Sequence, residues 1–118
     1  MSIPKQVIFL SLLLTGVAQA QQASCPAAQG KSLLAGVSVF DGPPGEMADL
    51  VPDVSRGGEA HLFQSWEVGY LFDQHRTLYL SCRYAAVVKP VVVKIDRRVK
   101  TCSFQAHGTA RSAVMSCR

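Results

Sequence analysis

Four cysteines are the residues of this chain whose chemistry is most constrained by their spacing. No two of them stand two to four residues apart, the spacing typical of structural zinc ligands and of redox Cys-x-x-Cys pairs. An even number of cysteines in a small exported domain predicts two disulfides instead. Of the three possible pairings we favour Cys25 with Cys82 and Cys102 with Cys117. The first would tie the N-terminal segment to a central strand, and the second would close a short hairpin.

Other reactive side chains do not form an arrangement typical of a catalytic or metal site. Asp73 and His75 stand two residues apart in an expected loop, but a structural or catalytic metal site needs three or more converging ligands. Glu46 and Asp49 are close in sequence, yet on a short helix they favour a solvated face over the carboxylate pair of a glycosidase. No serine stands in a Gly-x-Ser-x-Gly sequence. The sequence therefore predicts a non-enzymatic protein without metal or cofactor, and a small hydrolase or metal enzyme is the least favoured alternative.

An acidic segment rich in turn residues is the strongest candidate for a binding site. Its prolines and glycines stiffen a loop that displays four carboxylates, and a stiff loop loses little entropy on binding. Its charge favours a cationic partner. The alternative is a purely structural connection from a strand to a helix. The candidate binding loop comprises Asp41, Gly42, Pro43, Pro44, Glu46, Asp49 and Asp53.

Basic residues are concentrated in the second half of the chain. Residues 21–75 contain two basic and seven acidic residues, a net charge of −5, whereas residues 76–118 contain nine basic and one acidic, a net charge of +8. This division indicates a dipolar surface, unless the two halves interleave in the fold. A candidate basic patch around an expected hairpin tip would contact anionic polymers, or would simply protect the tip as charged residues commonly do. The patch comprises Lys94, Arg97, Arg98 and Lys100.

The first 20 residues are typical of a secretory signal peptide. Lys5 precedes an apolar run over residues 7–14, and Ala18-Gln19-Ala20 matches a small-x-small cleavage site. The run is shorter than the roughly 20 residues that span a bilayer. We therefore expect cleavage near Ala20, a single disulfide-linked domain over residues 21–118, and a periplasmic or secreted protein. Export excludes nucleic acid as a partner, no membrane span is expected, and the residues before Cys25 disfavour lipidation there.

The elements that must position these residues are mainly β-strands. Apolar and polar residues alternate over residues 62–68, 78–84 and 102–106, and residues 33–40 and 91–93 form further apolar runs. Residues 46–51 place Met47, Leu50 and Val51 on one helical face before Pro52. The sequence predicts a small antiparallel sheet or sandwich of about five to six strands, with one short helix over residues 46–51.

The position of Trp66 depends on the connection that follows it. A tight turn over residues 73–76 would place Trp66 opposite Arg83, on the face away from Leu80. A longer loop through Gly69 would place it on the Leu80 face. We favour the longer loop, because the largest apolar side chain is expected to be buried with the others.

Several short segments resemble a family of small periplasmic proteins of Gram-negative bacteria that is named only by an enterobacterial locus tag. The resemblance rests on the Asp-Gly-Pro-Pro segment at residues 41–44 and on the four-cysteine pattern, with Trp66 and residues 80–84 in support. It covers nearly all of residues 21–118 and implies an exported, disulfide-bonded domain. The family has no assigned activity, so the resemblance implies no mechanism.

The favoured function is that of a non-enzymatic protein-binding or inhibitor-type domain. Its partner would be another protein of the envelope, possible examples being a lysozyme-type hydrolase or a cationic toxin that meets the acidic loop. The alternative is an envelope accessory protein whose basic patch binds anionic surface polymers. Nothing in the sequence indicates an oligomeric state.

Overall fold

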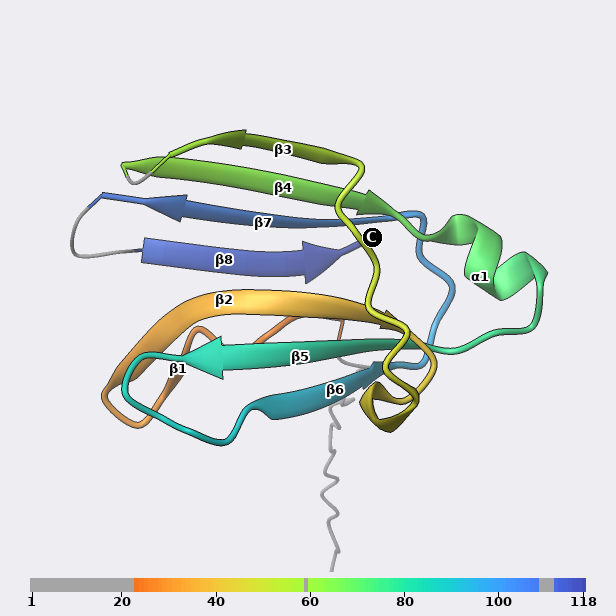
Figure 1. Cartoon of the computed structure of the whole chain (residues 1–118), viewed down its shortest axis with the longest axis horizontal. Helices are drawn as coiled ribbons and strands as arrows, with labels where there is room; N and C mark the ends of the chain where they lie inside the picture. The colour runs from red at the N-terminus through yellow and green to blue at the C-terminus, as the bar shows by residue number, and fades with distance from the viewer. Residues whose placement is uncertain (1–22, 59, 109–111) are drawn as a thin grey trace, which may run out of the picture.

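The computed structural model describes residues 23–58, 60–108 and 112–118, which form two four-stranded antiparallel sheets (Figure 1). The predicted signal peptide lies outside these residues. The mainly β class is confirmed, but the described chain has eight strands rather than five to six. The first sheet has the order β1 (Ala28–Gln29), β2 (Ser32–Asp41), β5 (Leu78–Tyr84), β6 (Val91–Ile95). The second has the order β3 (Val54–Gly57), β4 (His61–Glu67), β7 (Thr101–His107), β8 (Ser112–Cys117).

Alternating burial explains why these segments are strands. In β5, Leu78, Leu80 and Cys82 are fully buried, and in β7 the residues Cys102 and Phe104 are. Successive side chains of a strand point to opposite faces, so this period of two gives each sheet one apolar face. The buried side chains of both sheets belong to one continuous hydrophobic core.

The chain crosses between the two sheets three times, and these crossings change two of the predicted connections. After β4 the chain passes through the helix α1 (Gly69–Asp73) and enters β5 of the other sheet. Both hairpin registers considered for Trp66 are therefore wrong, since Trp66 pairs with Cys102 of β7. Its expected burial is confirmed, with 3% of its surface exposed. Trp66 is buried in the core between the two sheets, an arrangement that the alternation within a strand does not reveal.

The segment between β6 and β7 also crosses from one sheet to the other. It is not the hairpin tip that the basic residues were expected to surround. β6 pairs only with β5, at the edge of the first sheet, whereas β7 lies between β4 and β8 in the second. Each sheet thus combines strands from the acidic and the basic half of the chain. The two halves interleave, which disfavours a simple division of the surface into an acidic and a basic part.

The predicted helix over residues 46–51 is absent. A 3₁₀ turn, η1 (Pro44–Glu46), ends where that helix was expected to begin. Proline fits the first turn of a helix, which explains the start of η1. Met47 has φ 62°, in the left-handed region, and this ends the turn. The chain then pairs with the edge of β2, through a bridge between Phe40 and Asp49. The apolar spacing of residues 47–51 was read as helical, but extended pairing with a free strand edge satisfied the backbone instead.

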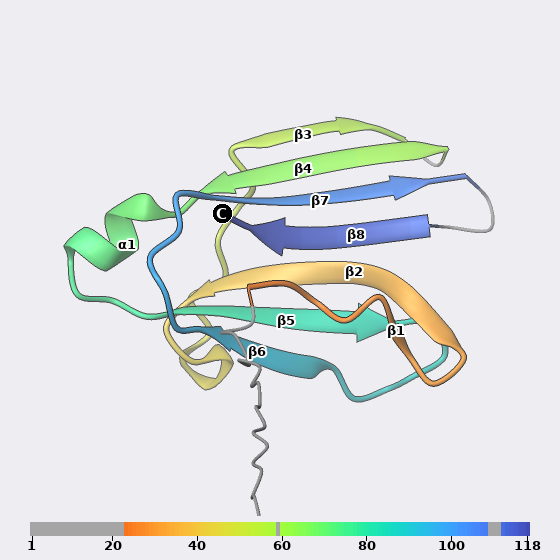
Figure 2. The ribbon, with the colours of Figure 1, turned by 180° about the vertical axis from the view of Figure 1, so that it is seen from behind.

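Both disulfides are present with the favoured pairing, Cys25–Cys82 and Cys102–Cys117. Cys102 and Cys117 are direct partners across β7 and β8. Residues 23–25 pair with β8 of the second sheet, because the amide of Cys25 donates to Met115 and that of Cys117 to Ala23. Since Cys82 belongs to the first sheet, Cys25–Cys82 links the two sheets covalently. Figure 2 shows this N-terminal segment in orange.

The described residues include one α-helix of five residues, and none of their helices is long and apolar enough to cross a bilayer.

Candidate partner-binding surface

Residues 47–53, which we call the strap, run from η1 to β3 and connect the first sheet to the second (Figure 1). At its start, the amide of Asp41 donates to the carbonyl of Ala48 at 3.0 Å, and the amide of Leu50 donates to Val39 at 2.8 Å. At its end, the amide of Asp53 donates to Ser65 of β4 at 2.8 Å. The strap is therefore held by both sheets.

Two further hydrogen bonds use side chains to fix the strap. The indole Nε1 of Trp66 donates to the carbonyl of Leu50 at 3.1 Å. The carboxylate of Asp53 accepts the amide of Glu67 at 2.6 Å. A charged acceptor makes the second bond stronger than a neutral one. The first bond holds the middle of the strap and the second holds its end, which leaves the strap little freedom.

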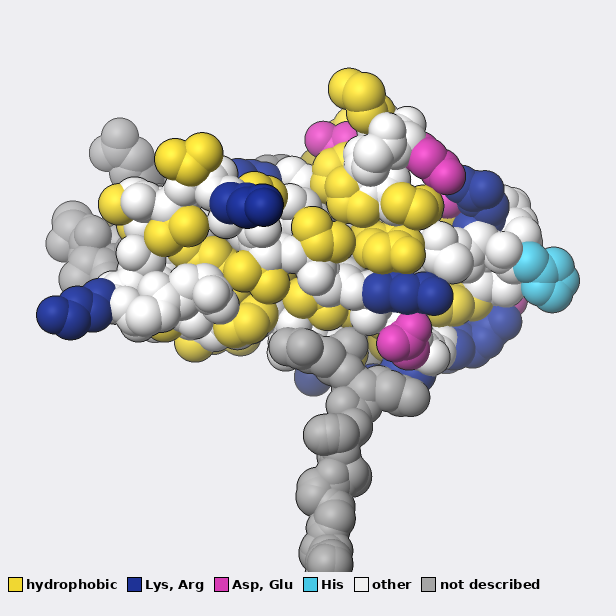
Figure 3. Space-filling view, turned by 90° about the horizontal axis from the view of Figure 1, so that it is seen from below, with side chains coloured by type: hydrophobic (Ala, Val, Ile, Leu, Met, Phe, Trp, Pro, Cys, Tyr) yellow, Lys and Arg dark blue, Asp and Glu magenta, His cyan; other side chains and the backbone are white. Residues whose placement is uncertain are grey.

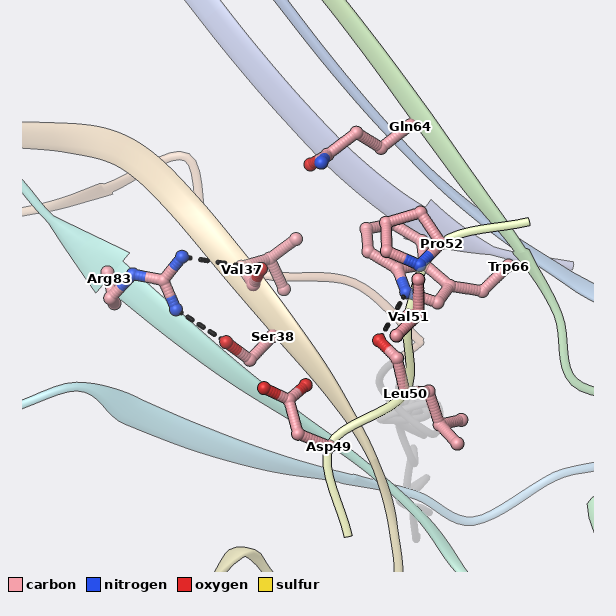
Figure 4. A pocket seen from close by; sticks show the side chains of 9 residues that line it. All are labelled: Val37, Ser38, Asp49, Leu50, Val51, Pro52, Gln64, Trp66 and Arg83. Carbon is pink, nitrogen blue, oxygen red and sulfur yellow. Dashed lines mark hydrogen bonds between the residues drawn. The ribbon is translucent and has the colours of Figure 1, made fainter. Parts of the chain in front are cut away.

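A pocket of about 290 Å³ opens beside the strap (Figure 4). Its polar side chains come from four elements: Arg83 of β5, Gln64 of β4, Asp49 of the strap and Ser38 of β2. The Arg83 guanidinium donates to Ser38 Oγ at 2.7 Å and to the carbonyl of Val37 at 3.4 Å, which holds it at one end of the pocket. The pocket is lined by Val37, Ser38, Asp49, Leu50, Val51, Pro52, Gln64, Trp66 and Arg83.

The carboxylates of the candidate binding loop have different surroundings. Asp41 forms an ion pair with Arg76 at 2.6 Å, and Glu46 lies 3.6 Å from the same guanidinium. Asp53 is engaged by the amide of Glu67, whereas Asp49 lines the pocket. Three of the four carboxylates therefore serve local structure, and Asp49 is the one beside an opening.

The first half of the candidate loop is a turn shaped by its glycine and prolines. Gly42 has φ 93°, a conformation that side chains with a Cβ rarely adopt, and its amide donates to Thr77 at 2.7 Å. Pro43 and Pro44 then lead into η1. Hydrogen bonding to Asp41, and the charges of Asp41 and then Glu46, raise the pKa of Arg76 above its ordinary value. These contacts make the turn a structural connection that sets where the strap begins.

Apolar side chains project from the strap into solvent. Met47 and Val51 are 82% and 83% exposed, respectively. Apolar side chains at such exposure on a fixed backbone are available for burial by a partner. Figure 3, the view from below, shows hydrophobic side chains over much of the underside of the molecule, with acidic and basic ones among them.

The candidate basic patch is divided between β6 and the crossing that follows it. Lys94 lies on β6 and is 3.8 Å from Asp96. Arg98 forms an ion pair with Asp73 at 2.8 Å and lies over the ring of Phe72. No ion pair is found among the described residues for Arg97 and Lys100, which lie in or beside the same crossing.

Two of the three histidines form a pair that the sequence analysis did not identify. Asp73 forms an ion pair with Arg98, and Asp73 and His75 were not favoured as a metal site by the sequence. Instead His61 and His107 are direct partners at the ends of β4 and β7, with their Nδ1 atoms 3.0 Å apart. Finding this pair from sequence would have required the β4–β7 register. Within the described ranges, no group of three or more His, Cys, Asp or Glu side chains is placed to hold a metal ion.

A search of family models matches residues 28–118 to the family described as type VI secretion system Tli immunity protein. No curated protein and no solved structure matches. The match agrees with the expected small disulfide-containing family. It corrects the expectation of a family without an assigned role, because its description states one.

Proposed function

This chain belongs to the type VI secretion system Tli immunity protein family, and from this premise we propose that it binds and neutralises a type VI effector protein. The family description carries the proposal, and it favours a binding role over catalysis. The inhibitor-type function expected from the sequence is the same kind of role. The effector would take the place of the unidentified protein partner.

We place this action in the periplasm. Disulfides persist in oxidising compartments such as the periplasm, and this chain pairs all four of its cysteines. The expected signal peptide over residues 1–20 would deliver it there. An immunity protein in that compartment would meet effectors that arrive from a neighbouring cell.

The strap and its pocket are the surface that we propose contacts the effector. Met47 and Val51 supply apolar anchors, and burying one such side chain contributes about 1.5–3 kcal/mol. The backbone beneath them is already fixed by both sheets, so binding would cost little loop entropy. The proposed contact surface thus keeps the candidate binding loop, with its centre near Asp49 and Val51 rather than at Asp41.

The polar groups of the pocket suggest what the effector presents. Asp49 would accept a lysine or arginine of the partner, and Arg83 would donate to a carbonyl or carboxylate. A segment with an apolar residue beside a basic one fits both features. The cationic partner expected from the acidic loop would thus meet one carboxylate, that of Asp49.

The experiment that tests this proposal is affinity capture of the protein exported by its own leader, followed by identification of stoichiometric partners by mass spectrometry. We expect to capture one effector. A cell that co-expresses this effector with the protein should survive, whereas a cell that expresses the effector alone should not. Capture without any stoichiometric protein, or failure to protect a cell from the captured protein, would contradict the immunity function.

A matched pair of variants tests the surface. Val51 and Val88 both lie outside the strands and are exposed, with exposed fractions of 83% and 101%. Val51→Asp should weaken effector binding about tenfold or more, whereas Val88→Asp should leave it unchanged. Asp49→Asn should reduce the salt dependence of binding almost as far as neutralising Asp41, Glu46, Asp49 and Asp53 together. Equal losses for Val51→Asp and Val88→Asp would remove the strap from the interface.

The anionic-polymer alternative is tested in the same strain. Charge reversal at Arg97 and Lys100 would abolish association with the envelope if surface polymers were the ligand. We expect this variant to retain both capture of the effector and protection.

A further inference from the structure

A cross-strand histidine pair lies at the end of the second sheet away from the strap. β4 begins at His61, β7 ends at His107, and the two residues are direct partners in the ladder (Figure 1). Both side chains are exposed. Strand alternation places His61 on the face of β4 opposite Trp66 and Gln64, so the pair is separate from the pocket beside the strap.

The two imidazoles are turned toward each other through the same kind of atom. Their Nδ1 atoms lie 3.0 Å apart, and the ring centroids are 5.1 Å apart at an interplanar angle of 79°. One Nδ1 carries a proton and donates it to the lone pair of the other. The ladder fixes both backbones as direct partners, which brings the two imidazoles within reach of each other.

This spacing matches the distance between two neighbouring nitrogen ligands on one metal ion. Metal–imidazole bonds are about 2.0–2.1 Å long, which separates two nitrogens by about 2.9 Å at a right angle and about 3.4 Å at a tetrahedral angle. The observed 3.0 Å falls within that interval. Imidazole is a favoured ligand of late first-row divalent ions.

We propose that His61 and His107 form a two-residue site for a late first-row divalent metal ion such as Ni²⁺ or Zn²⁺. Both imidazoles would coordinate through Nδ1, and water would complete the coordination sphere on the solvent side. The histidine that donates its Nδ1 proton in the free protein would carry that proton on Nε2 in the complex. Neutral imidazoles thus bind by a change of tautomer, without net loss of a proton.

The test uses the exported, disulfide-bonded protein without a polyhistidine tag, titrated with Ni²⁺ or Zn²⁺ alone. We expect one ion per chain by calorimetry. Saturating metal should also raise the unfolding temperature, because an ion that joins β4 to β7 binds the folded state alone. In two-dimensional NMR of the imidazole nitrogens, the Nδ1 signals of His61 and His107 should shift on binding.

Three single variants separate this site from other ligands. His61→Ala and His107→Ala should each weaken binding about tenfold or more and remove the rise in unfolding temperature. His75→Asn is the matched control, because His75 has φ 58°, which asparagine tolerates, and it should change neither quantity. Binding that survives both alanine variants, or no binding at metal concentrations up to about 1 mM, would overturn the proposal.

Discussion

At the scale of single residues, Tyr84 shows how a buried polar group ties the N-terminal segment to the first sheet. Its side chain is 3% exposed, and its hydroxyl donates to the carbonyl of Pro26 at 2.6 Å. Tyr84→Phe would remove the hydroxyl donor and leave the carbonyl of Pro26 without this hydrogen bond. We expect the free energy of unfolding at neutral pH to fall by about 1–3 kcal/mol, measured by urea denaturation.

The same residue makes stability depend on pH in the alkaline range. Burial raises the pKa of Tyr84 above its ordinary value of 10.0. Above pH 10 the unfolded chain therefore loses this proton while the folded protein keeps it, so the stabilisation from Tyr84 is lost as the pH rises through the folded pKa. The difference between wild type and Tyr84→Phe should therefore stay constant below pH 10.0 and shrink as the pH rises above it. A difference that stays constant or widens above that pH would contradict this assignment.

At the scale of elements, the turn before the strap depends on one glycine. Gly42 has φ 93°, and a Cβ placed there would lie 2.7 Å from Glu46 Oε1 and 3.1 Å from an Arg76 nitrogen. Gly42→Ala should therefore lower the free energy of unfolding by about 1–2 kcal/mol and weaken effector binding, because η1 and the strap would shift.

Gly45 supplies the matched control, because a Cβ there would meet nothing within 4 Å and its φ is not positive. Gly45→Ala should leave stability unchanged or raise it by about 0.4–1 kcal/mol. Both changes are read by thermal unfolding and by binding to the captured effector. If the two alanine variants behaved alike, the backbone of Gly42 would not control the strap.

The elements that the sequence predicted well are those with a single consistent period. Residues 78–84 alternate cleanly, and β5 spans Leu78–Tyr84. Residues 46–51 fit a helical face, yet six residues cannot hold a helix without docking, and the free edge of β2 was available to pair with them. The pairing of β4 with β7 was not predictable, since it joins strands that are distant in sequence.

The candidate site was predicted in part for the same reason. The acidic turn segment was recognisable from its prolines, glycines and carboxylates. Its division into a structural turn held by Arg76 and a strap beside a pocket depends on Arg76, Trp66 and Arg83, which lie outside the segment in sequence. The sequence places Met47 and Val51 on one face of a helix, whereas the structure exposes both on the extended strap.

At the scale of the whole molecule, ion pairs join the acidic half of the chain to the basic half. Arg76 holds Asp41, and Arg98 holds Asp73. The same interleaving occurs in both sheets, where early strands pair with late ones. The uneven charge along the sequence is therefore better explained by contacts within the fold than by two separate binding surfaces.

The two disulfides act over different distances, and their loss should have different effects. Cys25–Cys82 spans 57 residues and links the sheets, whereas Cys102–Cys117 spans 15 residues within one hairpin. Replacing the first pair with serine should cost about 4 kcal/mol and the second about 3 kcal/mol in the chain-entropy model. Hydrogen exchange should distinguish them further, because losing Cys25–Cys82 should expose amides of residues 23–25 and β5, while losing Cys102–Cys117 should affect β7 and β8 alone. Identical exchange patterns in the two variants would show that Cys25–Cys82 does not hold the sheets together.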